Sequence, residues 1–442
     1  MMKRFYCTAG AGMEDLLAEE VKTNLSATEV EQIPGRVFFC SNSHLHIVTQ
    51  LKSAERLFLL LHKAGAISLP NNPAKAADVI QQSIVGDADM WKQNVLTWTT
   101  LQGELQDRQQ RGQKRKRQED ESSNVDATST NSMNSNTQLG MDPPSFRVSC
   151  RCSGIIARSY TSQRLSRIIG MAIKEKLGWK VDLREPKLEV NVYLSDDHCI
   201  VGMPLLKHPL ASRHYMKHNG LRSTIAWAMT SLCPKQLNDC VILDPMCGVG
   251  AVLLEAAQDC SNTVFLGMDK DMSQLKKAKE NVKAAGMEGR VHLLQCSAME
   301  IPLNDGAVDA VLCDVPFGRK FSCSTDMPTA LPRLLKEMER VLRVGGHLVL
   351  LVSLQLSAQL KKIIRKQDQH ANSDTQKVHT DPSNANKECT DTPENLMCYK
   401  SSSKTPILIT SLRALKTHKV SLGSTDAFIH TFTKVQPEMC SH

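Results

Sequence analysis

No run of apolar residues in this chain approaches the roughly 18 that a membrane-spanning helix needs. The opening residues, Met1 to Tyr6, soon give way to polar and acidic side chains, so we expect no secretory signal. The 15 cysteines include no C-x-x-C pair, and the closest two, Cys150 and Cys152, lack the spacing of a zinc site. We therefore expect an intracellular protein with reduced thiols, no membrane span and no bound metal.

Two long segments lack the apolar residues that a folded core requires. Aromatic side chains are absent between Gln102 and Asp142, where Gln, Ser, Asn and Thr dominate, and residues 366–404 are similarly polar. Such segments cannot bury enough surface to fold, so we predict a disordered linker at 102–142 and a disordered insertion at 366–404. The linker carries the basic run Lys114–Arg117, which is either a nuclear import signal or solvated charge.

The remaining segments fall into three parts. The chain has 442 residues, enough for two or three domains, and its net charge of +8 is compatible with an acidic partner without proving one. Residues 1–101 alternate between short strand and helix patterns, with a helical run predicted from Ala54 to His62, and indicate a compact α/β unit. Residues 143–212 form a second part, and residues 213–436 contain the motifs that carry chemistry.

The second part shows an α+β pattern. An apolar stripe predicts a helix from Thr161 to Gly178, and the other side of that helix carries Arg164, Arg167 and Lys174. The alternating apolar residues that follow predict a half-buried strand pair. The basic helix side is either ordinary surface or a contact for the backbone of a nucleic acid.

The stretch from Val241 to Glu255 is the first motif. Its residues Val241–Leu243 predict a central parallel strand that is buried on both faces. Gly248 and Gly250 allow a tight turn and a close approach of a ligand, because glycine has no Cβ. A helix then begins near Ala251, and the free N–H groups at its start can face whatever lies above the turn.

An acidic residue follows at the end of the next predicted strand. Asp269 lies about 20 positions past the glycine turn, the distance at which a carboxylate commonly binds ribose hydroxyls. The full dinucleotide fingerprint is absent, since Leu253 occupies the place of its third glycine. Together with Asp244 before the turn, the spacing predicts a nucleoside-bearing ligand across these strand ends.

The second motif is Asp314-Val315-Pro316-Phe317-Gly318, which follows another predicted buried strand. At a strand end, a carboxylate, a rigid proline and an aromatic ring can hold a planar group that carries an exocyclic amine. Asp314 would accept hydrogen bonds from the amine, Pro316 would fix the backbone and Phe317 would stack on the ring. A plain strand-to-turn segment is the alternative interpretation.

The two motifs resemble motifs I and IV of class I S-adenosylmethionine-dependent amino-methyltransferases, whose motif IV reads Asn or Asp, Pro, Pro, then Tyr or Phe. Val315 replaces the first proline, and this departure is similar to the THUMP-domain guanine methyltransferases. The run Leu221–Ala226 is similar to the L-R-P-[ST]-I-A segment of the same family, with Ser223 at the usual proline. The resemblance covers residues 221–435, and residues 143–212 resemble a THUMP domain more loosely.

The resemblance implies a fold and a set of site residues. The fold is a ferredoxin-like N-terminal unit with a THUMP α+β region, followed by a Rossmann-like, seven-stranded class I methyltransferase domain. S-adenosyl-L-methionine would be bound by Asp244, Pro245, Cys247, Gly248, Gly250, Asp269 and Ser297. Ser297 stands where many relatives carry an acidic residue that holds the adenine amine. The implied catalytic residues are Asp314, Pro316 and Phe317, and the implied RNA-binding residues are Arg164, Arg167, Lys174 and Arg222.

The resemblance also implies a reaction and partners. Relatives methylate the exocyclic amine of guanosine in tRNA or in U6 small nuclear RNA, and several act with a small zinc-binding activator subunit related to Trm112. We therefore expect formation of N(2)-methylguanosine in a structured RNA by a heterodimer, in the nucleus and possibly also in the cytoplasm. Two alternatives stay open: a non-catalytic RNA-binding scaffold, and an amino-methyltransferase that acts on adenine or on a protein glutamine.

Overall fold

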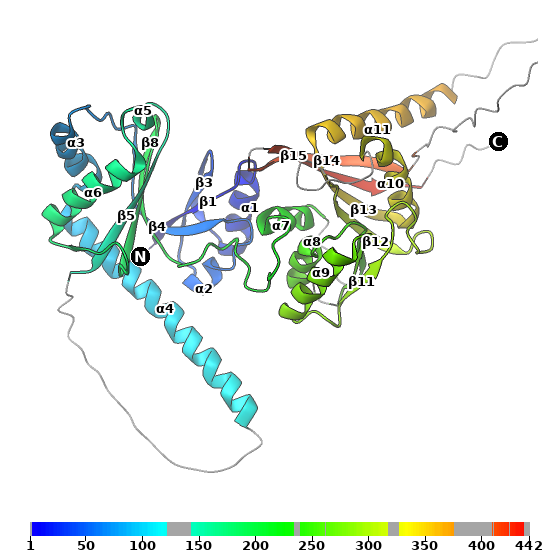
Figure 1. Cartoon of the computed structure of the whole chain (residues 1–442), viewed down its shortest axis with the longest axis horizontal. Coiled ribbons are helices and arrows are strands. Elements are labelled where there is room, and N and C mark those ends of the chain that lie inside the picture. Colours follow the sequence, from blue (N-terminus) through cyan, green and yellow to red (C-terminus); the bar gives the residue numbers. More distant parts are fainter. Residues whose placement is uncertain are drawn as a thin grey trace, which may run out of the picture. The chain divides into compact units, whose positions relative to one another are not determined.

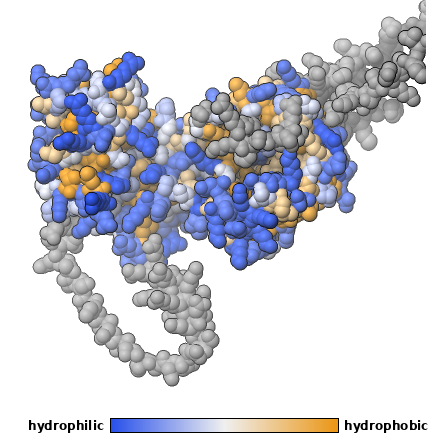
Figure 2. Space-filling model, in the orientation of Figure 1, coloured by the Kyte–Doolittle hydropathy of each residue, from blue (hydrophilic) through white to orange (hydrophobic). Residues whose placement is uncertain are grey.

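The computed structural model describes residues 2–121, 143–233, 239–260, 262–316, 327–374, 409, 411–423 and 425–436. The chain divides into two compact units, Met1–Ser212 and Arg213–His442 (Figure 1). On the face that Figure 2 shows, hydrophilic side chains predominate and apolar patches lie between them, as is normal for folded domains. Within the described residues no helix is long and apolar enough to cross a membrane, and no cluster of His, Cys, Asp or Glu could hold a metal ion.

The first unit is built on one sheet of eight strands. Its elements are β1 (Lys3–Thr8), α1 (Glu14–Leu25), β2 (Thr28–Ile33), β3 (Arg36–Ser41), α2 (Leu45–Val48), β4 (Arg56–Gly65), α3 (Pro73–Ile80), the π-helix η1 (Gln81–Val85), α4 (Ala88–Glu121), β5 (Ser145–Cys152), α5 (Ile156–Ser159), α6 (Ser162–Leu177), β6 (Lys180–Val181), β7 (Leu188–Leu194) and β8 (His198–Pro204). The strand order is β2-β3-β1-β4-β8-β7-β5-β6. Strands from the two parts that the sequence predicted separately therefore share one sheet.

Two hydrophobic cores lie against this sheet. One joins α1 and the strands β1, β3 and β4, and includes Phe5, Leu17 and Phe39. The other joins α6, α3, η1 and the start of α4 to β5, β7 and β8, and includes Trp91 and Phe146. Helices α3 and α4, which belong to the predicted residues 1–101, thus contribute to the core of the THUMP-like part.

The sheet curls strongly. The guanidinium carbon of Arg36, on β3, lies 3.6 Å from the ring centroid of Tyr193, on β7. In the sheet, strands β1, β4 and β8 lie between β3 and β7. Neighbouring strands are about 4.8 Å apart, so β3 and β7 would be separated by roughly 19 Å if the sheet were flat. A third, smaller cluster that includes Tyr6, Phe38 and Phe58 fills this inner side.

Two predictions for this unit were wrong. Residues 54–62 were predicted as helix, but Arg56–Gly65 form strand β4, which pairs with β1 on one side and with β8 on the other. A continuous apolar run is buried on both faces of such a central strand, and its periodicity cannot distinguish it from a buried helix. The predicted linker is also partly structured, since residues 102–121 lie in helix α4.

Tertiary contacts explain why α4 continues past residue 101. Leu101 is fully buried in the first core. Gln102 donates to the carbonyl oxygen of Leu205 at 2.9 Å, and Glu104 accepts from Lys3 at 3.2 Å and from the Leu45 amide at 3.1 Å. Composition alone does not reveal such partners. Residues 122–142 of the predicted linker and residues 375–404 of the predicted insertion lie outside the described residues. The prediction of disorder was wrong for residues 366–374 of that insertion, which belong to helix α11 (Leu354–Asp374).

The second unit is the predicted Rossmann-like domain. Its elements are α7 (Ser223–Ser231), β9 (Val241–Asp244), α8 (Ala251–Asp259), β10 (Val264–Asp269), α9 (Met272–Ala284), β11 (Val291–Gln295), β12 (Val308–Asp314), α10 (Met327–Val341), β13 (Leu342–Ser353), α11 (Leu354–Asp374), β14 (Leu412–Leu422) and β15 (Thr425–Lys434). The seven strands have the order β11-β10-β9-β12-β13-β15-β14. The seven-stranded sheet is confirmed.

Strands β9 to β13 run parallel, and β15 lies antiparallel between β13 and β14. Helices α10 and α11 pack on one face of the sheet, and α7, α8 and α9 lie on the other (Figure 1). The strand order reverses between β9 and β12. In open α/β sheets the carboxyl ends of the strands beside such a reversal form a crevice in which ligands bind.

Candidate functional site

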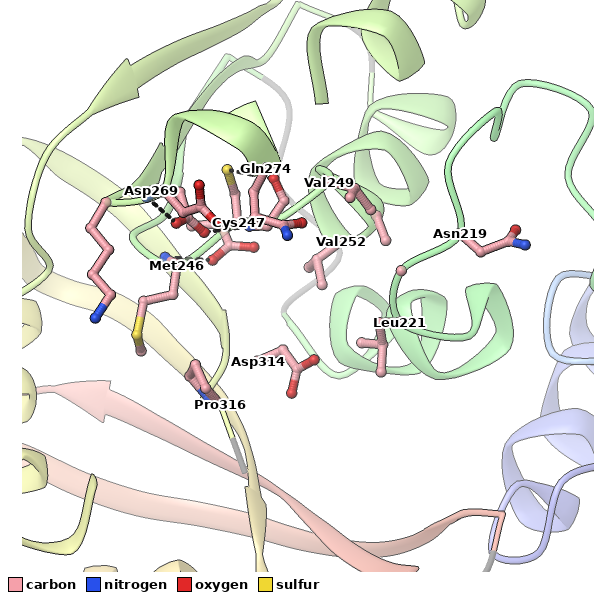
Figure 3. Close-up of a pocket in the computed structure, with 16 residues that line it drawn as sticks. Asn219, Leu221, Met246, Cys247, Val249, Val252, Asp269, Gln274, Asp314 and Pro316 are labelled. Atoms are coloured by element: carbon pink, nitrogen blue, oxygen red, sulfur yellow. Dashed lines mark hydrogen bonds between the residues drawn. The ribbon is translucent and has the colours of Figure 1, made fainter. Parts of the chain in front are cut away.

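A cavity of about 350 Å³ lies at the carboxyl ends of β9, β10 and β12 (Figure 3). Its size falls within the range of small-molecule sites. It is lined by Asn219, Gly220, Leu221, Asp244, Met246, Cys247, Gly248, Val249, Ala251, Val252, Asp269, Lys270, Asp271, Gln274, Asp314 and Pro316. The cavity is thus at the reversal of strand order, where the two sequence motifs meet.

The glycine turn forms the floor of the cavity. Gly248 and Gly250 have φ angles of +53° and +83°, which side chains other than glycine rarely adopt. The Cys247 amide donates to the carbonyl oxygen of Met268 at 2.8 Å, and the Gly250 amide donates to the carbonyl oxygen of Cys247 at 2.8 Å. Helix α8 begins directly after the turn, at Ala251.

The carboxylate of Asp269 is held from both sides. One oxygen accepts the Gly248 amide at 2.9 Å, and the other accepts the Asp271 amide at 2.8 Å. These bonds join the end of β10 to the glycine turn and fix the direction of the carboxylate. Asp269 can still accept further hydrogen bonds, because an ionised carboxylate has about four acceptor positions.

The cavity is acidic. Four aspartates, Asp244, Asp269, Asp271 and Asp314, line it together with one cationic side chain, that of Lys270. Burial raises the pKa of Asp244 well above its ordinary value, and the nearby carboxylates of Asp314 and Asp269 add to the effect, against a hydrogen bond from the Met246 amide. Such a lining disfavours anionic ligands such as a pyrophosphate and favours a cationic one.

Asp314 and Pro316 lie on the side of the cavity formed by β12. Asp314 is the last residue of that strand, and its carboxylate points into the open space between Leu221 and Pro316 (Figure 3). Burial raises the pKa of Asp314 to about 7. The Val315 amide donates to the carbonyl oxygen of Leu351 at 3.0 Å, so the turn after the strand is tied to β13. Phe317 lies outside the described residues.

The remaining wall comes from residues 213–221, which we call the strap and which contain no helix or strand. Asn219, Gly220 and Leu221 of the strap line the cavity. Leu221 begins the run Leu221–Ala226 that resembles a family segment, whereas Asn219 and Gly220 were not predicted as site residues. An Asn-Gly pair just before a helix is their only signal, and it is common in turns.

The predicted cofactor residues are only partly brought together. Asp244, Cys247, Gly248 and Asp269 line the cavity, as do the predicted catalytic residues Asp314 and Pro316. Pro245, Gly250 and Ser297 are not among the lining residues. Ser297 is exposed, and its hydroxyl accepts the Met299 amide at 3.2 Å within its own turn.

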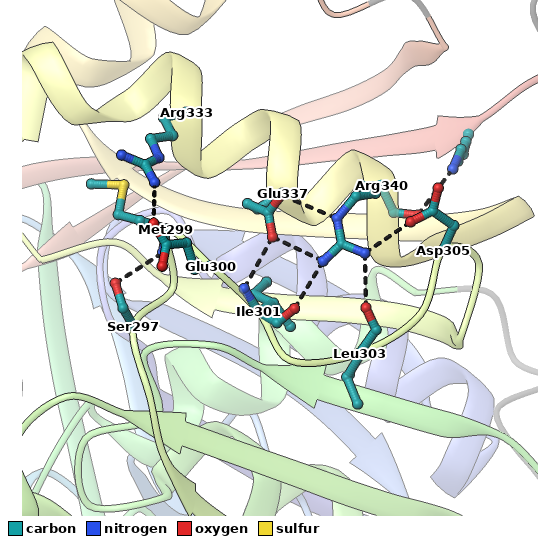
Figure 4. A network of polar contacts seen from close by, with 10 residues as sticks. Ser297, Met299, Glu300, Ile301, Leu303, Asp305, Arg333, Glu337 and Arg340 are labelled. Carbon is teal, nitrogen blue, oxygen red and sulfur yellow. Dashed lines mark hydrogen bonds and ion pairs between the residues drawn. The ribbon is translucent and has the colours of Figure 1, made fainter.

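The segment after β11 that contains Ser297 is held by helix α10 (Figure 4). Arg340 donates to the carbonyl oxygens of Ile301 and Leu303, both at 2.8 Å, and to Glu337 and Asp305. Glu337 in turn accepts the Ile301 amide at 3.0 Å. Glu300, three residues after Ser297, forms an ion pair with Arg333 at 2.5 Å. This network fixes the segment against α10.

The predicted RNA-binding residues are all exposed. Arg164, Arg167 and Lys174 project from α6 in the first unit, and Arg222 lies at the start of α7 in the second. Arg222 occupies the N-cap position of α7, and Ser223 is the first helical residue.

Comparison with known proteins matches both units. The sequence profile described as "RMKL-like, methyltransferase domain" matches residues 211–385, and that of the THUMP domain matches residues 120–203. The human U6 snRNA (guanine-N(2))-methyltransferase THUMPD2 is 35% identical over 98% of this chain and 96% of its own length. The bovine tRNA (guanine(6)-N(2))-methyltransferase THUMP3 is 32% identical over 49% of this chain and 46% of its own length.

A solved structure shares the fold of the whole chain. The crystal structure of TrmN from Thermus thermophilus superimposes with a TM-score of 0.63 and 20% sequence identity, over 98% of this chain and 100% of that one. The predicted order of a THUMP region followed by a class I methyltransferase domain is confirmed.

Proposed function

Because the chain belongs to the THUMP-domain guanine-N(2) RNA methyltransferases, we propose that it methylates the exocyclic amine of a guanosine in U6 small nuclear RNA. The relatives that match nearly the whole chain carry that activity in their names. Relatives that act on tRNA match about half of it, so a structured tRNA is the second candidate substrate. As a member of this family, the protein uses S-adenosyl-L-methionine as its cofactor.

The acidic lining of the cavity is the observation that carries this proposal. S-adenosylmethionine supplies a methyl group on a positively charged sulfur and also carries an ammonium group. Asp244 and Asp314 are carboxylates whose pKa values burial has raised, so a neighbouring cation favours their ionised forms. A phosphate-bearing cofactor would meet repulsion from the same residues.

Each wall of the cavity has a role in holding the cofactor. The glycine turn at Gly248 lets the ligand approach the backbone closely, and Asp269 is directed to accept hydrogen bonds from ribose hydroxyls. Asp244 would face the cationic part of the ligand, and Cys247 would pack beside it. Pro245 and Gly250 are buried and do not line the cavity, so they would act by shaping the turn itself.

Asp314 is the proposed catalytic carboxylate. The exocyclic amine of guanine is a poor nucleophile, because its lone pair is delocalised into the ring. Asp314 and neighbouring backbone carbonyl groups would accept the hydrogen bonds of the amine and favour its reactive, pyramidal form. Methyl transfer would form the C–N bond and break the C–S bond, S-adenosylhomocysteine would leave, and the acidified amine would pass its proton to the Asp314 carboxylate that holds it. Pro316 and Phe317 would hold the base, flipped out of its stack, in line with the methyl group.

The N-terminal unit would hold the RNA. Arg164, Arg167 and Lys174 lie on one exposed side of α6 and would contact phosphates, which supply affinity without reading sequence. Arg222 lies next to the cavity residue Leu221 in the chain and would contact the RNA near the target base.

A partner and a location complete the proposal. The protein would act as the catalytic subunit of a heterodimer with a small zinc-binding, Trm112-like activator, as the family resemblance implies. It would act in the nucleus, which agrees with a small-nuclear-RNA substrate and with the basic run Lys114–Arg117. Replacing that run with alanine in a fluorescent fusion should shift the protein toward the cytoplasm.

The experiment that tests the function uses purified protein, with and without a Trm112-like subunit, and methyl-labelled S-adenosylmethionine. U6 small nuclear RNA and total tRNA are offered separately, and the products are digested to nucleosides. We expect label in N(2)-methylguanosine from the U6 reaction. Label in N(2)-methylguanosine only from tRNA would move the substrate to the second candidate. Cofactor binding without label in either RNA would favour the scaffold or a protein substrate, and label in N(6)-methyladenosine would favour the adenine alternative.

A further inference from the structure

The strap, residues 213–221, closes one wall of the cavity without belonging to any helix or strand. The opposite walls are strand ends, whose positions are fixed by the hydrogen bonds of the sheet. The strap has no such ladder. Its position therefore depends on the side chains of the helices beneath it.

Asn281, on α9, is the side chain that joins the strap to the glycine turn. Its amide nitrogen donates to the carbonyl oxygen of His218 and to that of Val249, both at 3.0 Å. Its amide oxygen accepts the backbone amide of His218 at 2.9 Å. Asn281 is fully buried, so these three bonds are made away from water.

The strap and the turn are also in close contact. A Cβ atom added to Gly220 would lie 2.5 Å from Cγ2 of Val249, well inside van der Waals contact. Valine is branched at Cβ and stiff at χ1, so it cannot swing away cheaply. The close contact of the strap with residues 248–250 thus requires glycine at position 220. It also requires the hydrogen bonds of Asn281, which join the strap to the glycine turn.

The beginning of the strap is held separately. Glu255, on α8, is 1% exposed and accepts Nε of Arg213 at 2.7 Å as well as the hydroxyl of Tyr215. This cluster lies several residues before the lining segment 219–221. It sets where the strap enters the unit, whereas Asn281 sets where the strap meets the cavity.

We propose that Asn281 is a positioning residue for cofactor binding, which holds Asn219, Gly220 and Leu221 at the distance from the glycine turn that the cofactor requires. The inference rests on the proposed function to the extent that this cavity is the cofactor site. It adds a residue that neither lines the cavity nor belongs to either sequence motif. Asn281 acts only through the backbone atoms of His218 and Val249.

Two variants disturb the contact from its two sides. Asn281→Ala removes the bridge, and Gly220→Ala forces the strap away from Val249. For each we expect roughly tenfold weaker binding of S-adenosylhomocysteine by calorimetry and a similar rise in the KM for S-adenosylmethionine. The kcat at saturating cofactor should stay within about threefold, since Asp314 is untouched. Hydrogen exchange of the strap amides, that of His218 included, should accelerate in Asn281→Ala.

Two matched controls separate positioning from general damage. His218→Ala deletes a side chain that pairs with Glu280 but leaves the backbone groups that Asn281 binds. Val282→Ala removes buried packing from the next position of α9, where the side chain is 4% exposed. Both controls should keep the wild-type KM for the cofactor, although Val282→Ala should lower the melting temperature.

Wild-type cofactor binding by a folded Asn281→Ala protein would overturn the inference. So would an equal loss of binding in Val282→Ala, because the effect would then come from destabilisation of α9. If Asn281→Ala does not fold, the affinity of Gly220→Ala for S-adenosylhomocysteine and its KM for S-adenosylmethionine decide instead. Binding of S-adenosylhomocysteine needs no RNA. A protein that binds it but methylates no RNA would therefore contradict the proposed function, whereas the role of Asn281 in cofactor binding would still be decided by the binding measurements.

Discussion

In the C-terminal unit the proposed functional side chains lie at strand ends and line a cavity, whereas in the N-terminal unit the proposed RNA-binding side chains project from one exposed helix face. Asp269 is held by two backbone amides, and Asp314 ends a strand inside the sheet. Arg164, Arg167 and Lys174 are spread along α6 in contact with solvent. A buried site should therefore respond to single substitutions in an all-or-none manner, and an exposed one in a graded manner that depends on salt.

The sharpest test of the buried side is Asp314→Ala. Loss of the acceptor for the guanine amine should lower kcat by roughly 100- to 1000-fold. Binding of S-adenosylhomocysteine should stay near that of the wild type, because the cofactor contacts that we propose, at Asp244, Gly248 and Asp269, lie on the other walls. Single-turnover methylation and calorimetry measure the two effects. A variant with normal turnover would remove Asp314 from the mechanism.

Asp269→Ala should act on the cofactor rather than on the chemistry. It leaves the amides of Gly248 and Asp271 without their acceptor and removes the ribose contact. We expect a KM for S-adenosylmethionine raised roughly 10- to 100-fold. Asp305→Ala, an exposed aspartate that pairs with Arg340, is the control and should leave that KM unchanged. Equal effects in both variants would contradict the assignment.

The exposed side is tested by neutralising α6. Replacing Arg164, Arg167 and Lys174 with glutamine should weaken RNA binding roughly tenfold or more at low salt and should flatten the dependence of log K on log salt by roughly two to three units. Turnover at saturating RNA should change little. The matched variant replaces the exposed lysines of α9, Lys276, Lys277 and Lys279. If the α9 variant loses as much affinity for RNA as the α6 variant, RNA binding depends on the net charge of the protein and not on α6.

The pH profile should show the buried carboxylate directly. Burial raises the pKa of Asp314 to about 7, and the ionised form is the one that accepts hydrogen bonds from the amine. The value of kcat/KM should therefore be high above pH 7 and fall as the pH drops through it, by roughly tenfold between pH 8 and pH 6 for a single ionisation. In Asp314→Asn this step should vanish. A step that persists there belongs to another group.

The smallest effect is expected at Ser297. Its hydroxyl is occupied within its own turn and does not line the cavity. Ser297→Ala should leave the KM for the cofactor within about twofold. A rise of tenfold would instead support the sequence prediction that Ser297 holds the adenine amine.

Short-range patterns predicted the strand ends and the glycine turn well. Asp244, Gly248 and Asp269 belong to one strand-turn-helix-strand unit, so their spacing in the sequence is enough to predict their arrangement in space. Asp314 and Pro316 lie at the end of a predicted strand beside that unit. Parallel strands bring their carboxyl ends to one edge, and the cavity follows from that rule.

Contacts between distant segments were not predictable in the same way. The Asn281 bridge joins residues 218 and 249 to α9, and an asparagine inside a helix pattern gives no sign of its partners. The apolar run 56–65 was predicted as helix because only its pairing with β1 and β8 reveals a strand. The α4 helix likewise continues past residue 101 because of partners such as Lys3 and Leu205.

The shared sheet of the first unit also constrains how the protein can be made. Strand β4 pairs with β8 across residues 198–204, so one edge of β4 has no partner until those residues leave the ribosome. An apolar strand edge that has not yet paired can pair with another chain and cause aggregation. Residues 1–101 are therefore expected to fold late, together with the segment that follows the linker, rather than as they emerge. A ribosome-stalling series should show protease resistance of this part only once β8 has left the exit tunnel.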